Sequence, residues 1–329
     1  MTVRIGIPRA LLYYRYFPLW NTFFEALGFE VVVSRPAYRG LIEEGFKFAD
    51  DDTCIPIKMA YSHTVHIKDQ VDFLFIPRLL SFDRKSCCCP RLAGLPEMLR
   101  YSVPDLPPIL DPYVDERYRN TRLSHSLSEM ASRLGKGSKE IKQAYQKGET
   151  ALNLFREKMR RGEKVSELFP KREKNHRDQT EEGLNKKIAI VGHPYCLYDP
   201  YFNFNFIKTL EEAQVSIHTQ EQVSLEEIDS EIQNLGKDIY WTFGKEILGA
   251  SLHYLRSNEI DGLIYLTCFA CGVDSMIEPL VSHKAKEDGG GALYLCLMID
   301  EHTGTGGVLT RLEAFLETIE RRKRSGRMG

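Results

Sequence analysis

The chain has 329 residues, of which 43% are hydrophobic and 27% are charged, and this length and balance predict two soluble globular domains of ordinary size. Its formal net charge of −2 offers no basic excess to neutralise phosphates, so we expect no nucleic-acid partner. The first residues do not combine a charged segment, an apolar run and a cleavage site, so we expect no signal peptide. No apolar stretch approaches the roughly 18 residues of a membrane-spanning helix. We therefore expect a cytoplasmic protein with no membrane partner.

Residues 1–114 have the pattern of a small open α/β domain. A β-branched run, an aromatic helical pattern that stops at Gly28 and a second β-branched run follow one another. This strand–helix–strand order indicates a right-handed parallel crossover. The predicted strands are Val3–Ile7, Glu30–Val33 and Val71–Pro77, and the predicted helices are Leu11–Leu27 and residues 54–70.

Residues 115–185 differ from both flanks because they are polar and rich in Lys, Arg, Glu and Gln. Apolar residues recur there at helical spacing, which predicts helices, and the charged stretch 171–182 predicts a poorly ordered connection. We interpret the whole segment as a solvated helical connector.

Residues 186–329 return to alternating strand and helix signals, which predict a second α/β domain. The expected fold class is therefore α/β, with two Rossmann-like open parallel-sheet domains that face a cleft and are joined by a helical connector. The predicted strands are Lys187–Val191, Val215–His218, Gly262–Leu266 and Leu293–Ile299, and the predicted helices are Ile207–Ala213, Glu246–Ser257 and Val308–Arg321.

Eight cysteines are more than packing requires in a chain of this kind. A reducing compartment disfavours structural disulfides, so metal binding or redox chemistry is the more economical interpretation. In open parallel sheets, ligands bind beyond the carboxyl ends of strands, and most of the cysteines follow predicted strands. Cys54 is different, because it precedes a predicted helix that Thr53 could cap.

Three of the cysteine segments, at residues 51–56, 86–91 and 267–272, suit an iron–sulfur cubane because such clusters take thiolate ligands. Backbone N–H groups in these loops can donate hydrogen bonds to the sulfurs. Gly272 lets the backbone approach a cluster closely.

Zinc is the alternative metal. Cys268 and Cys271 have the spacing of half a zinc site, but no second local pair of ligands is in reach, so zinc ranks below iron–sulfur. Cys196 and Cys296 are interpreted as packing residues, since buried cysteine commonly behaves as a small apolar side chain. The cysteines that either pack inward or add ligands to a cluster are Cys87, Cys88 and Cys268.

The turns after two predicted strands supply candidate acid–base groups, namely His193, Glu301 and His302, each of which is otherwise a hydrogen-bonding loop residue. Residues 304–307 are glycine-rich and begin the last predicted helix, where either an anion or a simple turn and cap is expected. This segment is not a Walker motif, and the chain contains neither GxGxxG nor GxSxG.

Eight ordered segments carry a resemblance to a known family. They are IGIPRALLYY, DDTCIPIKMAYSH, VDFLFIPRLLS, CPRLAGLPEM, VGHPYCLYDPY, YWTFGKEILGASLHYL, FACGVDSM and LMIDEHTGTGGVLTRLEAF. The chain resembles the acyl-CoA dehydratase activase-related proteins, a group similar to the cluster-carrying subunits of 2-hydroxyacyl-CoA dehydratases and benzoyl-CoA reductases and to the double-cubane cluster proteins. The resemblance covers nearly all of both α/β domains and leaves out the charged middle.

This resemblance implies a 4Fe–4S cluster between the domains, with thiolates at the positions of Cys54, Cys89 and Cys271 and a fourth iron site that is open or holds a different ligand. It also implies a separate ATP-hydrolysing iron–sulfur activator protein, and a homodimer or a related subunit. The additional cysteines would permit an 8Fe–9S double cubane. The dehydratases of this group work as two different subunits, whereas this is one chain, and nothing in it identifies a CoA pocket.

Three functions stay open at this point. The first is an enzyme component of anaerobic metabolism, an iron–sulfur reductase or acyl-CoA dehydratase component, in which an open iron site acts as Lewis acid and one-electron donor. The second is non-enzymatic electron transfer or cluster delivery, which predicts four protein ligands and no substrate cavity. The third is a relic of the fold in which the cysteines only pack. The sequence does not determine a substrate.

Overall fold

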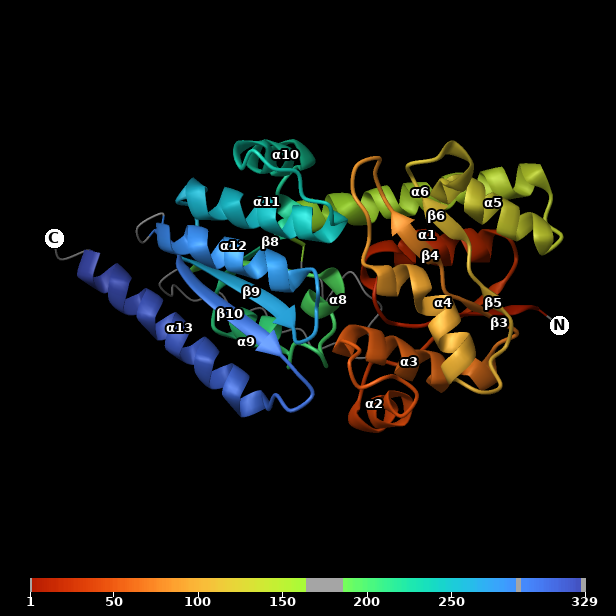
Figure 1. Ribbon diagram of the computed structural model, residues 1–329, viewed down its shortest axis with the longest axis horizontal. Coiled ribbons are helices and arrows are strands. Elements are labelled where there is room, and N and C mark those ends of the chain that lie inside the picture. The colour runs from red at the N-terminus through yellow and green to blue at the C-terminus, as the bar shows by residue number, and fades with distance from the viewer. Residues whose placement is uncertain (1, 164–185, 288–290, 327–329) are drawn as a thin grey trace. The chain divides into compact units, whose positions relative to one another are not determined.

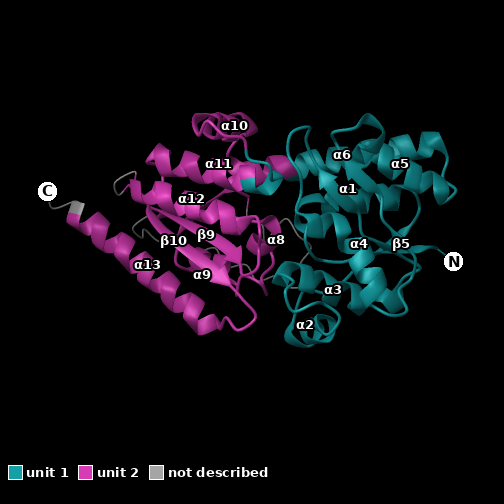
Figure 2. Cartoon of the chain, in the orientation of Figure 1, with its two compact units in different colours: residues 1–155, 239–244 teal, residues 156–238, 245–329 magenta. Residues whose placement is uncertain are grey.

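The computed structural model describes residues 2–163, 186–287 and 291–326, and the chain divides into two compact units. Unit 1 comprises Met1–Phe155 and Ile239–Gly244, and unit 2 comprises Arg156–Asp238 and Lys245–Gly329 (Figure 2). Each unit contains one four-stranded sheet with helices around it (Figure 1). All the strand pairs of these sheets are parallel, which confirms the predicted α/β class with Rossmann-like domains.

The sheet of unit 1 has the order β2-β1-β3-β5. Its central strand β1 (Arg4–Ile7) pairs with β2 (Glu30–Val33), and Glu30–Val33 has the predicted bounds. The helix between them, α1 (Tyr13–Ala26), is followed by Gly28 at φ +79°, so the predicted glycine stop is confirmed. The other elements of this layer are β3 (Phe73–Phe75), β5 (Ile109–Leu110), α2 (Arg39–Phe46), α3 (Ile55–Ile67) and α4 (Pro90–Ser102).

Aromatic side chains hold α1 against the sheet. The rings of Trp20 and Phe24 both meet Phe75 of β3 edge to face, with centroids 5.3 Å and 5.0 Å away. Aromatic pairs in this arrangement each contribute about 0.5–1.5 kcal/mol beyond the burial of their surface. The aromatic pattern in the sequence therefore marks a helix that packs on the core.

The predicted strand Val71–Pro77 is shorter than expected, because β3 ends at Phe75 and a separate strand β4 (Arg78–Ser81) follows. β4 pairs with β6 (Tyr113–Asp115) in a small two-stranded sheet that the sequence did not indicate. Residues 239–244 also join this unit, since the N–H of Cys87 donates to the carbonyl of Tyr240 at 2.8 Å and the N–H of Thr242 donates to the carbonyl of Cys87 at 2.9 Å.

The sheet of unit 2 has the order β10-β9-β7-β8. Its central strand β9 (Gly262–Cys268) is buried at every position, as expected for a parallel strand covered on both faces. β10 (Leu293–Ile299) has the predicted bounds, β7 (Lys187–Gly192) is one residue longer than predicted, and β8 (Ser216–Thr219) is shifted by one residue at both ends. The helices are α8 (Pro194–Leu197), α9 (Phe206–Glu212), α10 (Leu225–Asn234), α11 (Thr242–Ser257), α12 (Asp274–Glu287) and α13 (Thr305–Gly326).

The segment predicted as a connector begins with two helices, α5 (Leu123–Arg133) and α6 (Ser138–Arg160), and α5 groups with unit 1. The stretch 171–182, predicted as a poorly ordered connection, lies outside the described residues, so the division into 1–114, 115–185 and 186–329 stays a prediction. Among the helices of the described ranges, none has the length and apolar character needed to cross a lipid bilayer. Single 3-10 turns complete the chain at Lys68–Gln70, Arg119–Thr121 and Gln220–Gln222.

Candidate functional site

The carboxyl ends of β7 and β9 bring one predicted residue, His193, into the site. Gly192 pairs with Leu266 in the register of the two strands. A Cβ at Gly192 would lie 2.3 Å from the carbonyl oxygen of Leu266, so only glycine allows the strands to approach this closely. His193 follows immediately as the N-cap of α8 and is 2% exposed.

The loop after β9 brings in Cys271. Within this loop Ala270 has φ +63°, a left-handed conformation that is uncommon for residues other than glycine. The turn is closed by a 3.3 Å hydrogen bond from the N–H of Cys271 to the carbonyl of Cys268. Backbone strain of this kind is concentrated at functional sites, where surrounding structure maintains it. The left-handed residue is thus Ala270. Gly272 is exposed, and the close approach of its backbone to a cluster stays a prediction.

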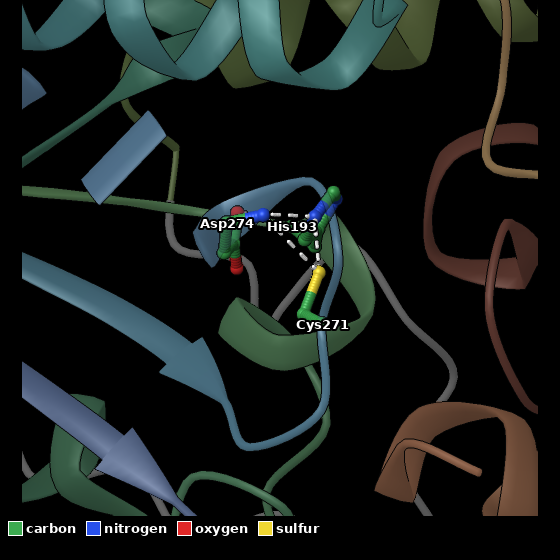
Figure 3. A group of neighbouring side chains, drawn as sticks. All are labelled: His193, Cys271 and Asp274. Carbon is green, nitrogen blue, oxygen red and sulfur yellow. Dashed lines mark hydrogen bonds and ion pairs between the residues drawn. The ribbon is translucent and has the colours of Figure 1, made fainter. Parts of the chain in front are cut away.

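Three side chains meet at this edge of the unit 2 sheet (Figure 3). Nε2 of His193 lies 3.6 Å from Sγ of Cys271 and 3.3 Å from Oδ1 of Asp274. The backbone N–H of Asp274 also points at Sγ, at 3.5 Å. The ring of Tyr195 stacks on the imidazole with centroids 4.9 Å apart and planes 6° apart. His193 is therefore held in one orientation, with its Nε2 edge toward the sulfur and the carboxylate.

Two strand residues orient the carboxylate of Asp274, which is 2% exposed at the start of α12. The hydroxyl of Tyr265 donates to Oδ1 at 2.9 Å, and the hydroxyl of Thr267 donates to Oδ2 at 2.5 Å. A buried carboxylate is costly unless its oxygens are hydrogen-bonded, and both oxygens are satisfied here.

These contacts set the ionisation of the three groups. Burial alone would lower the pKa of His193, but the charges of Asp274 and Cys271 raise that pKa well above its usual value. Burial alone would raise the pKa of Asp274, but the charge of His193 holds it below its usual value. The hydrogen bond from Cys268 lowers the pKa of Cys271 to about 5 against the effect of burial, and His193 acts in the same direction. These shifts all favour the charged forms of the three groups, namely an imidazolium, a carboxylate and a thiolate.

Such a group has two chemical uses. A sulfur, an imidazole nitrogen and a carboxylate oxygen that lie within 4.8 Å of one another are donor types accepted by zinc and by iron. A thiolate beside an imidazolium is also the arrangement that activates a cysteine as a nucleophile. Cys271 is the reactive group in both cases: His193 favours its negative charge, and His193 and the backbone N–H of Asp274 hold its position.

The predicted cysteines of unit 1 lie at two neighbouring helix N-termini. Cys54 is the N-cap of α3 and Cys89 is the N-cap of α4, and each helix has proline in its first turn. Nη2 of Arg91 donates to the carbonyl of Asp52 at 3.0 Å, which ties one loop to the other. Both cysteines are half-buried, and a helix N-terminus favours the thiolate form. The predicted cap at Thr53 is wrong, because Cys54 occupies that position and its side chain makes no capping hydrogen bond.

The two cysteines that precede Cys89 have different surroundings. The guanidinium of Arg117 donates to Sγ of Cys87 at 3.2 Å, while its other nitrogens bond to Asp115. Cys88 is 5% exposed, and its N–H donates to the carbonyl of Leu80 at 2.7 Å. Both belong to the strand-like segment that pairs with residues 239–244, and their roles as additional ligands stay predictions.

Of the remaining candidates in unit 2, Cys196 adjoins this group, because its side chain is hydrogen-bonded to Cys268 and the charges of His193, Asp274 and Cys271 act on its pKa. Cys196 is completely buried, and burial raises its pKa above the usual value. Cys296 is inside β10 as predicted, and burial raises its pKa to about 12, so it is a neutral thiol. Glu301 and His302 are exposed in the turn after β10, which Asp300 stabilises by accepting the N–H of His302 at 2.9 Å.

Sequence reasoning missed Asp274, which contributes as much to the site as His193 does. The signal was present, because Asp274 stands three residues after Cys271 at the start of a helix, where an acidic residue is favoured. The strand residues Tyr265 and Thr267 carried no such signal, because their hydroxyls are recognisable as ligands of a carboxylate only once the fold is known.

The model of one protein family matches residues 4–223, which is more than half of the chain. That family is described as the CoA enzyme activase uncharacterised domain (DUF2229). The chain belongs to this family. The match spans the loops of Cys54 and Cys89 and the β7–α8 turn with His193, and it ends before Cys271. No curated protein matches the chain.

Proposed function

We propose that this protein is an iron–sulfur protein of the 2-hydroxyacyl-CoA dehydratase type, in which Cys54, Cys89 and Cys271 hold a cubane-type 4Fe–4S cluster. The observation that carries the proposal is that the surroundings of all three cysteines favour the thiolate form. Cys271 has its pKa lowered to about 5, and Cys54 and Cys89 are half-buried at helix N-termini. Thiolates are the ligands that such clusters require, so the donor chemistry fits. When bound, the cluster would supply low-potential one-electron chemistry and a Lewis-acid site for a thioester carbonyl.

Within this proposal His193 and Asp274 are positioning residues. Asp274 orients the imidazole, and the imidazole holds Sγ of Cys271 at 3.6 Å and favours its anionic form. Partners one step removed from a metal ligand set the orientation and basicity of that ligand. We expect the two residues to affect how tightly Cys271 binds iron and to leave the thiols of unit 1 unaffected.

The proposed partner is an ATP-hydrolysing iron–sulfur activator that reduces the protein. The family description, which refers to a CoA enzyme activase, supports a system of this kind, and the chain contains no Walker motif of its own. The smaller cluster is favoured over an 8Fe–9S double cubane, because Cys87 is already bonded to Arg117 and Cys88 is almost completely buried.

One observation favours the alternative of non-enzymatic electron transfer or cluster delivery. If cluster binding displaced the proton of His193, its Nε2 would become a second donor atom beside Cys271, which would suit a cluster whose iron atoms all have protein ligands. The two functions differ in their response to substrate. An open iron site changes its EPR signal when an acyl-CoA thioester is added, whereas a fully ligated cluster does not.

The deciding experiment is iron and sulfide analysis with EPR on protein purified without oxygen. We expect about four irons per chain. Cys54→Ala, Cys89→Ala and Cys271→Ala should each lower the iron content, and Cys296→Ala serves as the matched control because its thiol is neutral and lies inside a strand. Colourless protein that contains zinc, or full iron in all three variants, would contradict the proposal.

A further inference from the structure

A second group of buried polar atoms lies in unit 1 at the carboxyl ends of β1 and β2 and has no role in the proposed function. Ser34 directly follows β2 and is 1% exposed. Its Oγ accepts a hydrogen bond from the backbone N–H of Arg9, just beyond β1, at 2.8 Å. The same Oγ lies 2.9 Å from Nδ1 of His63 on α3. Three elements of the fold therefore converge on one serine hydroxyl.

These contacts decide which nitrogen of His63 carries hydrogen. Ser34 Oγ receives the amide hydrogen of Arg9, and among the described residues Nδ1 of His63 is the one group that can accept the hydrogen of this buried hydroxyl, so the arrangement that satisfies the hydroxyl makes Nδ1 an acceptor. Burial lowers the pKa of His63 to about 3, and the charge of Arg9 acts in the same direction, so the imidazole is neutral. A neutral imidazole that accepts at Nδ1 carries its hydrogen on Nε2. That Nε2–H is buried and has no hydrogen-bond partner among the described residues.

Arg9 also has a buried N–H group without a hydrogen-bond partner among the described residues. This group is Nε, and the guanidinium lies 5.3 Å from the ring of Tyr13. Among the ion pairs of the described residues none includes Arg9, whose side chain is half-buried. A water molecule would satisfy the two buried N–H groups, and an oxyanion would in addition pair with the charge of Arg9.

The backbone beside Arg9 supports a ligand site. Leu11 has φ +52°, a conformation that bulky residues seldom adopt and that is concentrated at functional sites. The carboxyl end of a parallel sheet is also where open α/β folds bind their ligands.

The geometry points to an oxyanion-binding site at this edge of unit 1, in which the guanidinium of Arg9 and the Nε2–H of His63 donate hydrogen bonds to the oxygens of a phosphate or carboxylate group. Arg9 supplies the charge and a planar set of donors. His63 supplies a neutral donor, and Ser34 fixes its tautomer as a positioning residue. The site uses none of the proposed cluster cysteines.

The test titrates the full-length protein, labelled with ¹⁵N at histidine, with inorganic phosphate and separately with acetate at constant ionic strength. The Nε2–H resonance of His63, identified by its loss in His63→Asn, should shift and saturate. Arg9→Gln should weaken the binding at least about tenfold, as expected when a charged hydrogen bond is lost. The anion that binds more tightly identifies the ligand class.

Two control variants make the result specific. Arg39→Gln removes an exposed guanidinium that pairs with Glu43, and His66→Gln changes another imidazole of the same helix, so both should bind like the unmodified protein. If Arg9→Gln does not fold, Arg9→Lys keeps the charge but loses the planar donors and should weaken binding in the same direction. No saturable shift with either anion, equal affinity in the Arg9 variant, or a water cross-peak at Nε2–H that persists under saturating anion would overturn the proposal.

Discussion

Cys271 of unit 2 lies against a buried histidine–aspartate pair, whereas Cys54 and Cys89 of unit 1 lie at the N-caps of two helices. In unit 2 the negative sulfur is favoured mainly by two side chains, Cys268 and His193, so substitution of either one weakens that support. In unit 1 the cysteines make no side-chain capping hydrogen bond, and a negative sulfur is favoured by the helix dipole, which no side-chain substitution removes. The two units therefore use different means to prepare thiolates for what we propose is a shared cluster, and the means can be separated experimentally.

The strongest test of this contrast is Asp274→Ala. Removal of the carboxylate leaves a buried imidazolium without its partner and leaves the hydroxyls of Tyr265 and Thr267 without their acceptor. We expect the free energy of unfolding to fall by about 3 kcal/mol, as measured by urea denaturation of the metal-free protein. Asp300→Ala, in the exposed turn after β10, is the control and should cost well under that value. A loss for Asp274→Ala no larger than for the control would mean that the pair is not ionised.

Gly192→Ala should cause the next largest loss of stability. The added methyl group would meet the carbonyl oxygen of Leu266 at 2.3 Å, so β7 and β9 must separate and move His193 relative to Cys271. We expect a loss of about 2 kcal/mol in the free energy of unfolding, since overpacking of a close contact typically costs about 1–3 kcal/mol. Gly304→Ala is the matched control because nothing lies within 4 Å of its added Cβ. Equal stability of the two variants would show that the strands accommodate the methyl group.

The pH dependence of Cys271 distinguishes the two kinds of support directly. Its pKa of about 5 lies below the ordinary thiol value of 9.0, so the thiolate contributes stability that is full above about pH 9 and is lost as the pH falls toward 5. In metal-free protein, its alkylation by iodoacetamide should change little between pH 8 and 6. A thiol of ordinary pKa slows about tenfold per pH unit over that range.

His193→Asn should raise the pKa of Cys271 and make its alkylation more dependent on pH, although the hydrogen bond from Cys268 remains, and should leave the alkylation of Cys54 and Cys89 unchanged. Peptide mapping by mass spectrometry separates the three sites. An unchanged pH profile at Cys271 in the variant would contradict the role given to the imidazole.

The smallest change in the free energy of unfolding is expected from a substitution in unit 1, which should stabilise the protein. Cys54 occupies the N-cap of α3 without a side-chain capping bond, and serine is among the best N-cap residues. Cys54→Ser should therefore raise the stability of the metal-free protein by about 0.5–1 kcal/mol while lowering its iron content. Cys196→Ser is the control, because a hydroxyl placed at that completely buried position should destabilise unit 2. A drop in stability for Cys54→Ser would indicate that the sulfur has a packing role.

Much of the fold could be predicted from the sequence, because most strands of both units are apolar or β-branched runs that end at distinct turn residues. The bounds of Glu30–Val33 and Leu293–Ile299 and the glycine stop at Gly28 follow from local chemistry alone. The small sheet of β4 and β6 was missed since its strands are short and pair over a long separation in sequence. Backbone pairing of this kind leaves no pattern in the side chains.

The candidate site was predictable only in part, for a related reason. Cys271 and His193 attract attention as residue types beyond strand ends, but their contact depends on the register of Gly192 with Leu266. The left-handed residue of the loop proved to be Ala270, at a position that sequence reasoning gave no cause to single out. The sequence thus shows which reactive residue types are present, whereas the fold is needed to show which of these side chains come into contact.

The short return of residues 239–244 to unit 1 has a consequence for how the protein is made. The first part of unit 1 ends at Phe155, and the segment that pairs with Cys87 is synthesised only after much of unit 2. At a synthesis rate of roughly 5–20 residues per second, this delay is on the order of ten seconds. During that time the strand-like edge at Cys87–Cys88 lacks its partner. A nascent chain of this protein therefore has an interval in which these neighbouring thiols are open to assembly factors, to oxidants or to metal before the chain closes over them.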